Sequence, residues 1–247
     1  MIDFAECRSI WWRRPQPLRI SDSITSEQHR LFAHSEAQEA ITGLWQALDA
    51  EWINPPLKDL AAHHKVFQLR VAQEIGLRIP DTLITNNPAE ARAFIEARGA
   101  EEIAFKSFSA TEQDWRETRV LSEEELKHLE AVALAPVIFQ EYIEAAYDLR
   151  VTVIANQVFP AAIYSQQTSY KADFRMDFAH AKVGPAELPA CLSKLLLEYM
   201  RRLELTYGAI DMRMTPQGEY VFLEINPAGQ WQFIEQQTKA SSTESVG

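Results

Sequence analysis

Two carboxylates and an amide stand close together near the end of this sequence of 247 residues. Glu224 and Asn226 are separated by one residue in the stretch FLEINPAGQW, so the two-residue period of a strand places their side chains on one face. A Pro-Gln-Gly turn joins this strand to TYGAIDMRMT, and the resulting hairpin can bring Asp211 beside them. Such hard oxygen ligands suit Mg²⁺. A carboxylate pair solvated at a sheet edge is the alternative, and these residues alone leave it open.

Two lysines are candidate phosphate ligands. Lys106 lies in the apolar strand IAFKSF, where alternation can point it into a cleft. Lysine is rarely buried without a partner charge, which a phosphate would supply. An edge-strand lysine that discourages aggregation is the alternative. Lys65 follows the adjacent histidines His63 and His64, whose spacing is poor for a metal, so all three also fit a solvated surface.

The segment FQEYI has the features of a nucleotide hinge. An apolar strand leads into polar positions whose backbone groups can read the edge of an adenine. The residues proposed to form this hinge are Gln140, Glu141, Tyr142 and Ile143.

Several charged residues lie close to the hinge or to the hairpin. Asp148 and Arg150 are two apart on the strand DLRV, where they can address ribose hydroxyls and phosphate or acyl-phosphate oxygens. Arg175 and Arg213 are further candidates for phosphate or substrate contacts. For any one of these arginines, a surface ion pair of small energetic weight is the alternative.

Alternating helices and strands are expected to position these residues. One helix is predicted over 26–52, stopped by Asn54-Pro55-Pro56, and one continuous helix over 57–76, ended by Gly76. Further helices are indicated at 88–97, at 122–132 behind a Ser122/Glu125 capping box, and at 187–203. The strands are indicated by RIPDTLIT, EIAFKSF, TRV, VIFQEYI, DLRVTVIANQ, VFPAAIYSQ, TYGAIDMRMT and GEYVFLEIN. This order predicts an α+β fold with antiparallel-rich sheets.

Composition limits the class of function. The net charge of -11 argues against a nucleic-acid partner, which needs a basic footprint. Cys7 and Cys191 fit neither a disulfide framework nor a zinc site and indicate a reducing compartment. No apolar run approaches the ~20 residues that cross a bilayer, and the start lacks a secretory signal, so we expect a cytoplasmic protein without a membrane partner. P-loop, Rossmann and G-x-S-x-G motifs are absent.

Taken in order, these motifs resemble an ATP-grasp ligase over about residues 55–238. The resemblance rests on Lys65 in HHKVFQLRVAQEIGLRIPDTLIT, Lys106 in IAFKSF, the FQEYI hinge, DLRV, and AIDMRM with FLEINPAGQW. Within that superfamily, SIWWRRPQP and EINPAGQW resemble the microviridin-type graspetide synthetases, which crosslink side chains of a ribosomally made precursor peptide. The ribosomal-protein glutamate ligase is a more distant relative with the same core.

The resemblance implies two α+β lobes that hold ATP between antiparallel-rich sheets. Residues 57–142 would form the small lobe and 143–238 the C-terminal lobe with the metal site. Before them, 1–25 would be a remnant of an N-terminal lobe with its linker, and 26–56 a connecting helix. Residues 239–247 would be a flexible tail, and the loop SATEQDWRE, which lacks glycine, would be the flap over the phosphates.

The same resemblance implies roles for the candidate residues. Mg²⁺ would be held by Asp211, Glu224 and Asn226. ATP would be held by Lys65, Lys106, the four hinge residues 140–143 and Asp148. Arg150 and Arg175 would lie on the phosphate and acyl-phosphate side, and Arg150 or Arg213 could stabilise a tetrahedral oxyanion.

The implied activity is ATP-dependent closure of ω-ester or ω-amide crosslinks in a precursor peptide that carries a leader. An alternative is a carboxylate–amine ligase that adds a free amino acid to a peptide or protein. A third reading, from a different class, is an ATP-binding regulatory module without turnover. A homodimer is left open.

Overall fold

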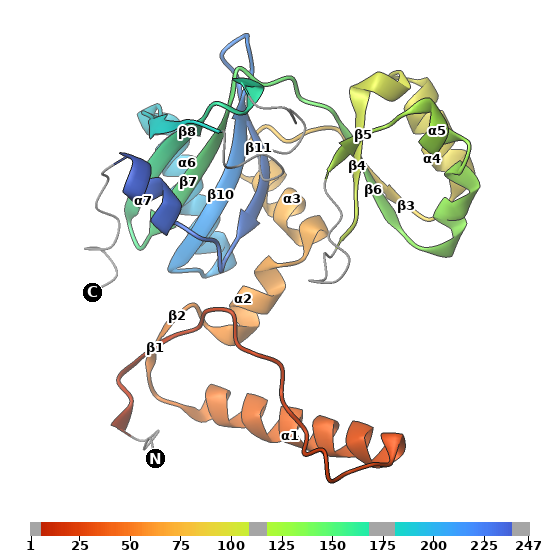
Figure 1. Ribbon diagram of the computed structural model, residues 1–247. Helices are drawn as coiled ribbons and strands as arrows, with labels where there is room; N and C mark the ends of the chain where they lie inside the picture. Colours follow the sequence, from red (N-terminus) through yellow and green to blue (C-terminus); the bar gives the residue numbers. More distant parts are fainter. Residues whose placement is uncertain (1–5, 109–117, 168–180, 239–247) are drawn as a thin grey trace.

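The computed structural model describes residues 6–108, 118–167 and 181–238 (Figure 1). The described chain forms two α+β lobes side by side and an N-terminal limb below them. Each lobe is built on one sheet, and within the lobe sheets every strand pairing is antiparallel, as expected from the sequence.

The larger lobe contains a five-stranded sheet in the order β11-β10-β7-β8-β9. One face packs on helices α3 and α6, and buried side chains from these helices and from β7, β10 and β11 form the main hydrophobic core. Helix α7 packs against β9 with Ile234 in a small second core. The elements are β7 (Tyr147–Ile154), β8 (Gln157–Ile163), β9 (Val183–Pro185), β10 (Tyr207–Met214), β11 (Tyr220–Asn226), α3 (Lys65–Glu74), α6 (Ala190–Leu203) and α7 (Gln232–Thr238).

The smaller lobe contains a four-stranded sheet in the order β3-β6-β4-β5. Its own core joins α4 to the inner face of the sheet through apolar residues such as Ile95, Ile103 and Phe139. The predicted capping box is confirmed, because Ser122 and Glu125 bond each other's backbone groups at the start of α5. The elements are β3 (Thr82–Thr85), α4 (Pro88–Glu96), β4 (Ile103–Lys106), β5 (Arg119–Val120), α5 (Glu123–Leu126) and β6 (Val137–Glu141).

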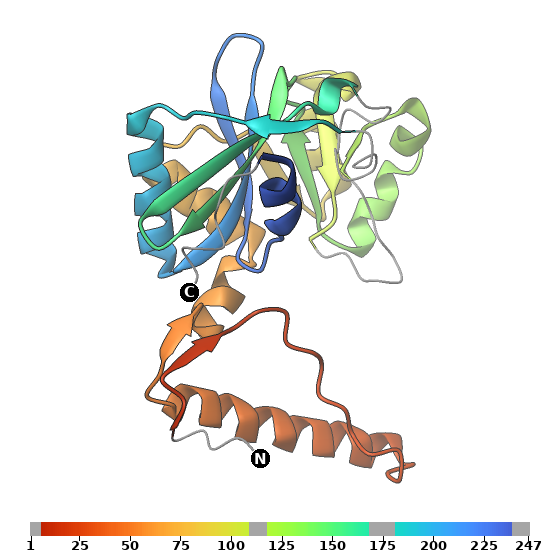
Figure 2. The ribbon, with the colours of Figure 1, turned by 60° about the vertical axis from the view of Figure 1, so that its left-hand side comes forward.

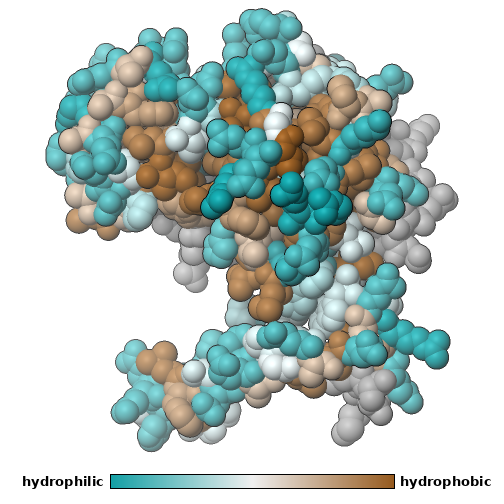
Figure 3. Space-filling view, turned by 180° about the vertical axis from the view of Figure 1, so that it is seen from behind, coloured by the Kyte–Doolittle hydropathy of each residue, from teal (hydrophilic) through white to brown (hydrophobic). Residues whose placement is uncertain are grey.

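The N-terminal limb contains α1 (Glu27–Ala47) and a parallel pair of short strands, β1 (Ser9–Trp11) and β2 (Glu51–Ile53). Helix α1 buries none of its residues, and Leu31 and Phe32 are each 67% exposed. Figure 3 shows the limb extending below the lobes, with apolar side chains at one end. Its strand β1 contacts the larger lobe, where Trp11 packs against Trp231 at 5.3 Å between ring centroids. Across the described ranges, no helix combines the length and apolar character needed to span a membrane.

Three of the predicted helices are wrong in their bounds. The helix predicted over 122–132 is α5 (Glu123–Leu126) followed by a separate 3-10 helix, Leu129–Leu134. The helix predicted over 26–52 ends at Ala47, because Trp52 and Ile53 extend and pair with β1. Trp12 packs edge-on against Trp45 at 4.5 Å between ring centroids and holds this pairing on the helix. The continuous helix predicted over 57–76 is two helices, α2 (Pro56–Ala62) and α3, separated at residues 63–64.

The lobe boundary expected near residue 57 also differs from the structure. Leu69, Val71 and Leu77 lie in the core of the larger lobe, together with residues of α6 and β11. The smaller lobe's core instead begins with the contacts of β3 and α4 and ends at β6. The physical reason is that the apolar face of α3 packs on the larger sheet, so residues 57–80 belong with that lobe.

A close backbone approach at Gly229 gives a stability prediction. A Cβ added there would lie 2.4 Å from Ala209 Cβ, which neither backbone can relieve without moving the sheet. We expect Gly229→Ala to lower the free energy of unfolding by about 2 kcal/mol through overpacking. Gly43→Ala is the matched control, since its new Cβ meets nothing within 4 Å on α1 and should stabilise by about 1 kcal/mol. Equal thermal shifts in the two variants would contradict this explanation.

Candidate active site

A cleft of about 680 Å³, open to solvent, lies between the two lobes. Nine of the thirteen candidate residues line it, so side chains from β4, β6, β7, β10 and β11 converge on one space. A cleft between two lobes, lined by apolar side chains and a few converging polar groups, is a typical site for a small ligand. The candidates that line it are Lys106, Gln140, Glu141, Tyr142, Ile143, Asp148, Asp211, Arg213 and Glu224.

The β10–β11 hairpin places the acidic pair side by side. Asp211 and Glu224 are directly paired across the two strands, and Asn226 is two residues further along β11. A register shift follows immediately, because Met212 pairs with Phe222 and leaves Leu223 as the extra residue of a bulge. Asn226 Oδ1 accepts a hydrogen bond from Ala228 N at 2.9 Å, which fixes the turn after the strand.

A cation lies against each carboxylate. The ammonium group of Lys65 contacts Glu224 Oε2, and Arg150 Nη1 lies 3.0 Å from Asp211 Oδ1. The Lys65 and Glu224 side chains are only 19% and 17% exposed, so solvent screens this attraction less than at the surface. Two adjacent and largely buried carboxylates need positive charge beside them, and Lys65 and Arg150 supply it.

These residues fit Mg²⁺ by the chemistry of their donor atoms. Two carboxylates and an amide are all oxygen donors, and Mg²⁺ in nucleotide enzymes is bound by one or two carboxylates together with substrate phosphates. Within the part of the chain that the structure describes, no group of three or more His, Cys, Asp and Glu residues is placed to hold a metal. The role of Asp211, Glu224 and Asn226 as metal ligands stays a prediction.

Asp148 and Arg213 form a buried ion pair under the cleft. Arg213 Nε donates to Asp148 Oδ1 at 2.8 Å, and Arg213 Nη1 donates to the Ile143 carbonyl at 2.6 Å. Burial works against the guanidinium charge, but Asp148 outweighs it and the pKa of Arg213 is raised. Asp148 Oδ2 is buried without a hydrogen-bond partner among the described residues, so a ligand hydroxyl in the cleft would satisfy it.

The hinge residues are fixed by hydrogen bonds from their own backbone. Glu141 N donates to the Asp81 carbonyl at 2.8 Å, and Tyr142 N donates to the Glu102 carbonyl at 2.7 Å. These two N–H groups are therefore committed to the protein. Within the described structure, the N–H of Ile143 is the hinge donor left for a nucleotide base.

Four further candidate features differ in their position. Lys106 ends β4 and lines the cleft, on the wall opposite the hairpin. Arg150 lies behind Asp211, and its Nε is buried without a hydrogen-bond partner among the described residues. Arg175 and the predicted flap SATEQDWRE lie outside the described residues.

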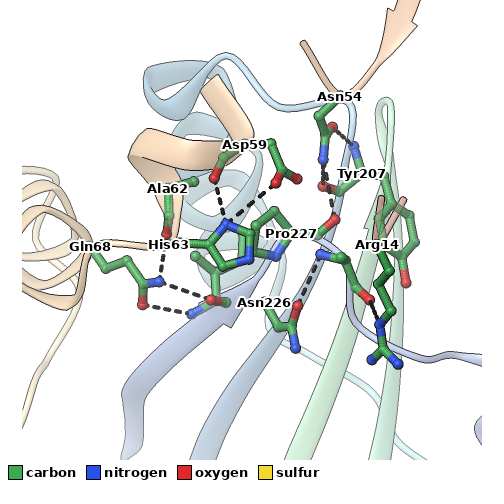
Figure 4. A network of polar contacts seen from close by, with 11 residues as sticks. Arg14, Asn54, Asp59, Ala62, His63, Gln68, Tyr207, Asn226 and Pro227 are labelled. Atoms are coloured by element: carbon green, nitrogen blue, oxygen red, sulfur yellow. Dashed lines mark hydrogen bonds and ion pairs between the residues drawn. The ribbon is translucent and has the colours of Figure 1, made fainter. Parts of the chain in front are cut away.

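Two buried amides near the hairpin are missed by the sequence reasoning (Figure 4). Asn54 Oδ1 accepts from Tyr207 N at 2.8 Å, and its Nδ2 donates to the carbonyls of Tyr207 and Pro227 at 2.9 and 3.2 Å. Gln68 bonds the main chain of β11 in the same manner. In the sequence, Asn54 is a polar residue where a helix is predicted to stop, and Gln68 is a polar residue inside a predicted helix. Both patterns are too common to mark these two residues as important.

The comparison with protein families identifies the class. The RimK-like ATP-grasp domain matches residues 62–245, which is most of the chain. The chain therefore belongs to this family of ATP-using ligases, and the predicted ATP-grasp fold is confirmed.

Solved structures point to a particular group in that family. The macrocyclase MdnC of Microcystis aeruginosa MRC, bound with the precursor peptide MdnA, is 36% identical, with a TM-score of 0.83 over 95% of this chain and 75% of that one. A RiPP-associated ATP-grasp ligase of Chryseobacterium gregarium, in complex with ADP and a leader and core peptide, is 30% identical, with a TM-score of 0.84 over 93% and 72%. The macrocyclase MdnB of the first organism is 30% identical, with a TM-score of 0.80 over 99% and 77%. No curated protein matches the sequence.

Proposed function

We propose that this chain is an ATP-dependent macrocyclase of a ribosomally made precursor peptide. It would activate Asp or Glu side chains of that peptide as acyl phosphates and close them onto Thr, Ser or Lys as ω-ester or ω-amide crosslinks. The observation that carries the proposal is the interlobe cleft with the Asp211–Glu224 pair at its wall. Support also comes from the similarity to MdnC, whose structure holds a precursor peptide.

In the nucleotide half of this mechanism, the chain's residues bind and orient ATP. The Ile143 N–H would read the base, and Asp148 Oδ2 would accept a ribose hydroxyl. Lys106, which lines the cleft, and Lys65, which contacts the cleft residue Glu224, would hold the phosphates. Mg²⁺ bound at Asp211, Glu224 and Asn226 would neutralise charge on the transferring phosphoryl group.

In the transfer half, a carboxylate oxygen of the peptide attacks the γ-phosphate, and ADP leaves. A hydroxyl or amine of the same peptide then attacks the activated carbonyl and expels phosphate. Arg150, which pairs with Asp211, would stabilise the oxyanion of that second step. Arg213 is tied to Asp148 and Ile143, so we assign it to supporting the hinge.

Mass spectrometry of a peptide substrate tests this function. The peptide would be one encoded beside this chain and rich in Thr, Ser, Asp and Glu, incubated with ATP and Mg²⁺. We expect the loss of one water per crosslink and stoichiometric ADP, with no change when ATP is omitted. No mass change with intact ATP binding would overturn the proposal and favour a binding module without turnover.

A carboxylate–amine ligase is the second candidate, because the matching family model is RimK-like. The same experiment separates the two. A gain of mass equal to an added free amino acid would favour this second activity over crosslinking.

A further inference from the structure

Gln68 makes a pair of hydrogen bonds to the backbone between two of the predicted metal ligands. Its Oε1 accepts from Ile225 N at 3.1 Å, and its Nε2 donates to the Ile225 carbonyl at 2.9 Å. Ile225 stands between Glu224 and Asn226. One side-chain amide therefore binds both polar groups of the residue that links these ligands.

The position of β11 explains why such a contact is needed. β11 is the first strand of its sheet, so one side of its backbone has no neighbouring strand. At Ile225 this edge is covered by α3, and Gln68 offers a donor and an acceptor there in place of a strand. At Phe222, beyond the bulge, the Arg78 carbonyl takes the N–H at 2.8 Å.

Gln68 is itself held on several sides. It is 1% exposed, and its Nε2 also donates to the Ala62 carbonyl at 2.6 Å (Figure 4). Its own carbonyl accepts from the Tyr199 hydroxyl at 3.1 Å. The bond to Ala62 ties the end of α2 to the same amide. Because Gln68 is buried and held by these bonds, its side chain has few other conformations, and it fixes the position of the atoms that it binds.

Helix α3 contacts both the backbone and a side chain of β11, the strand that carries Glu224 and Asn226. Lys65, one turn before Gln68, contacts the Glu224 carboxylate. The Ile225 side chain points to the opposite face and lies in the main core, so the residue is fixed from both sides. The spacing of Glu224 and Asn226 then depends on a backbone that Gln68 holds in place.

We propose that Gln68 is a positioning residue for the metal site, holding the β11 backbone so that Glu224 and Asn226 reach one cation. This inference rests on the proposed function and adds a residue that touches neither nucleotide nor metal. Groups that orient ligands in this manner typically change metal affinity by about tenfold or more.

Metal binding to Gln68→Met tests the proposal, since methionine keeps the length but loses all three side-chain bonds. Free Mn²⁺ would be counted by electron paramagnetic resonance with a non-hydrolysable ATP analogue present. We expect the Mn²⁺ affinity of the variant to be about tenfold weaker than that of the wild type. The affinity for the ATP analogue, measured with a metal chelator present, should change less than twofold. If the wild type binds no Mn²⁺, the metal assignment itself fails. If the wild type binds Mn²⁺ and folded Gln68→Met binds it equally well, this inference alone is overturned.

Two control variants separate positioning from general stability. Gln73→Met changes an exposed glutamine of the same helix and should leave Mn²⁺ affinity unchanged. Leu196→Ala removes a fully buried core side chain of α6 and should lower the melting temperature without weakening Mn²⁺ binding. A loss of Mn²⁺ affinity in Leu196→Ala as large as in Gln68→Met would overturn the proposal.

A measurement on the wild type applies even if Gln68→Met does not fold. Because Gln68 holds Ile225 before any ligand arrives, the Ile225 amide should exchange slowly with solvent in the ligand-free protein. Adding the ATP analogue with Mn²⁺ should change that exchange little. Exchange as fast as that of an exposed loop amide would show that Gln68 does not hold the strand, which contradicts the proposal.

Discussion

Glu224→Gln is expected to lower ATP turnover about a thousandfold or more while the chain stays folded. The substitution removes one of two carboxylates that face each other across β10 and β11, and with it most of the attraction for a divalent cation. Such a cation contributes several kcal/mol to a phosphoryl transition state, and each 1.4 kcal/mol is a factor of ten in rate. ADP release in the presence of the peptide and Mg²⁺ measures the effect.

Asp211→Asn should have a similar effect on turnover but a larger effect on stability. It leaves Arg150, whose side chain is 8% exposed, without its carboxylate partner, and breaking a buried pair typically costs about 3–5 kcal/mol. Glu219→Gln is the matched control on the same hairpin, since that carboxylate pairs with Arg78 at the surface. Full turnover in folded Glu224→Gln and Asp211→Asn would refute the metal assignment.

The hairpin could be read from the sequence because its signals are local. Period-two alternation and the Pro-Gln-Gly turn predict the hairpin and place Glu224 and Asn226 on one face. The direct pairing of Asp211 with Glu224 does not follow from that pattern. Continuing the register of Met212 with Phe222 would place Asp211 opposite Leu223, and the bulge at Leu223 shifts it to Glu224.

The break between α2 and α3 could not be read in the same way. Neither glycine nor proline stands at 63–64, and the apolar pattern runs on through the break. Local side-chain contacts bond the backbone at the interruption, with Gln68 Nε2 donating to the Ala62 carbonyl and His63 Nδ1 lying 2.7 Å from the Asp59 carbonyl. Gln68 also bonds Ile225 of β11, and this packing of α3 on the larger sheet decides the lobe to which residues 57–80 belong.

The ion pairs in the cleft were also beyond sequence reasoning, although every member was a candidate. The family resemblance predicts Lys65 as a phosphate ligand and Glu224 as a metal ligand, and the structure shows the two side chains in contact with each other. Arg150 and Asp211 pair in the same way. Such pairs form because a largely buried charge needs an opposite charge beside it. With the proposed roles, Lys65 would compete with the metal for Glu224 until a phosphate offers it another partner.

Lys65→Met tests this competition, because its two expected effects have opposite signs. Without nucleotide, Mn²⁺ affinity should rise about tenfold, because Lys65 no longer competes with the ion for Glu224. With nucleotide and peptide, turnover should fall about a hundredfold, because one phosphate contact is lost. Electron paramagnetic resonance of Mn²⁺ and ADP release measure the two effects in the same preparations.

Lys58→Met is the matched control. Lys58 lies on the neighbouring helix α2 and forms an exposed ion pair with Glu204, so its substitution should change neither quantity. If Lys65→Met leaves nucleotide-free Mn²⁺ affinity unchanged or lowers it, the Lys65–Glu224 pair only supports the fold. A rise in Mn²⁺ affinity with full turnover would place Lys65 away from the phosphates. Both signs together would identify Lys65 as the group that leaves the metal ligand Glu224 for the nucleotide, and binding of the two ligands would then be coupled.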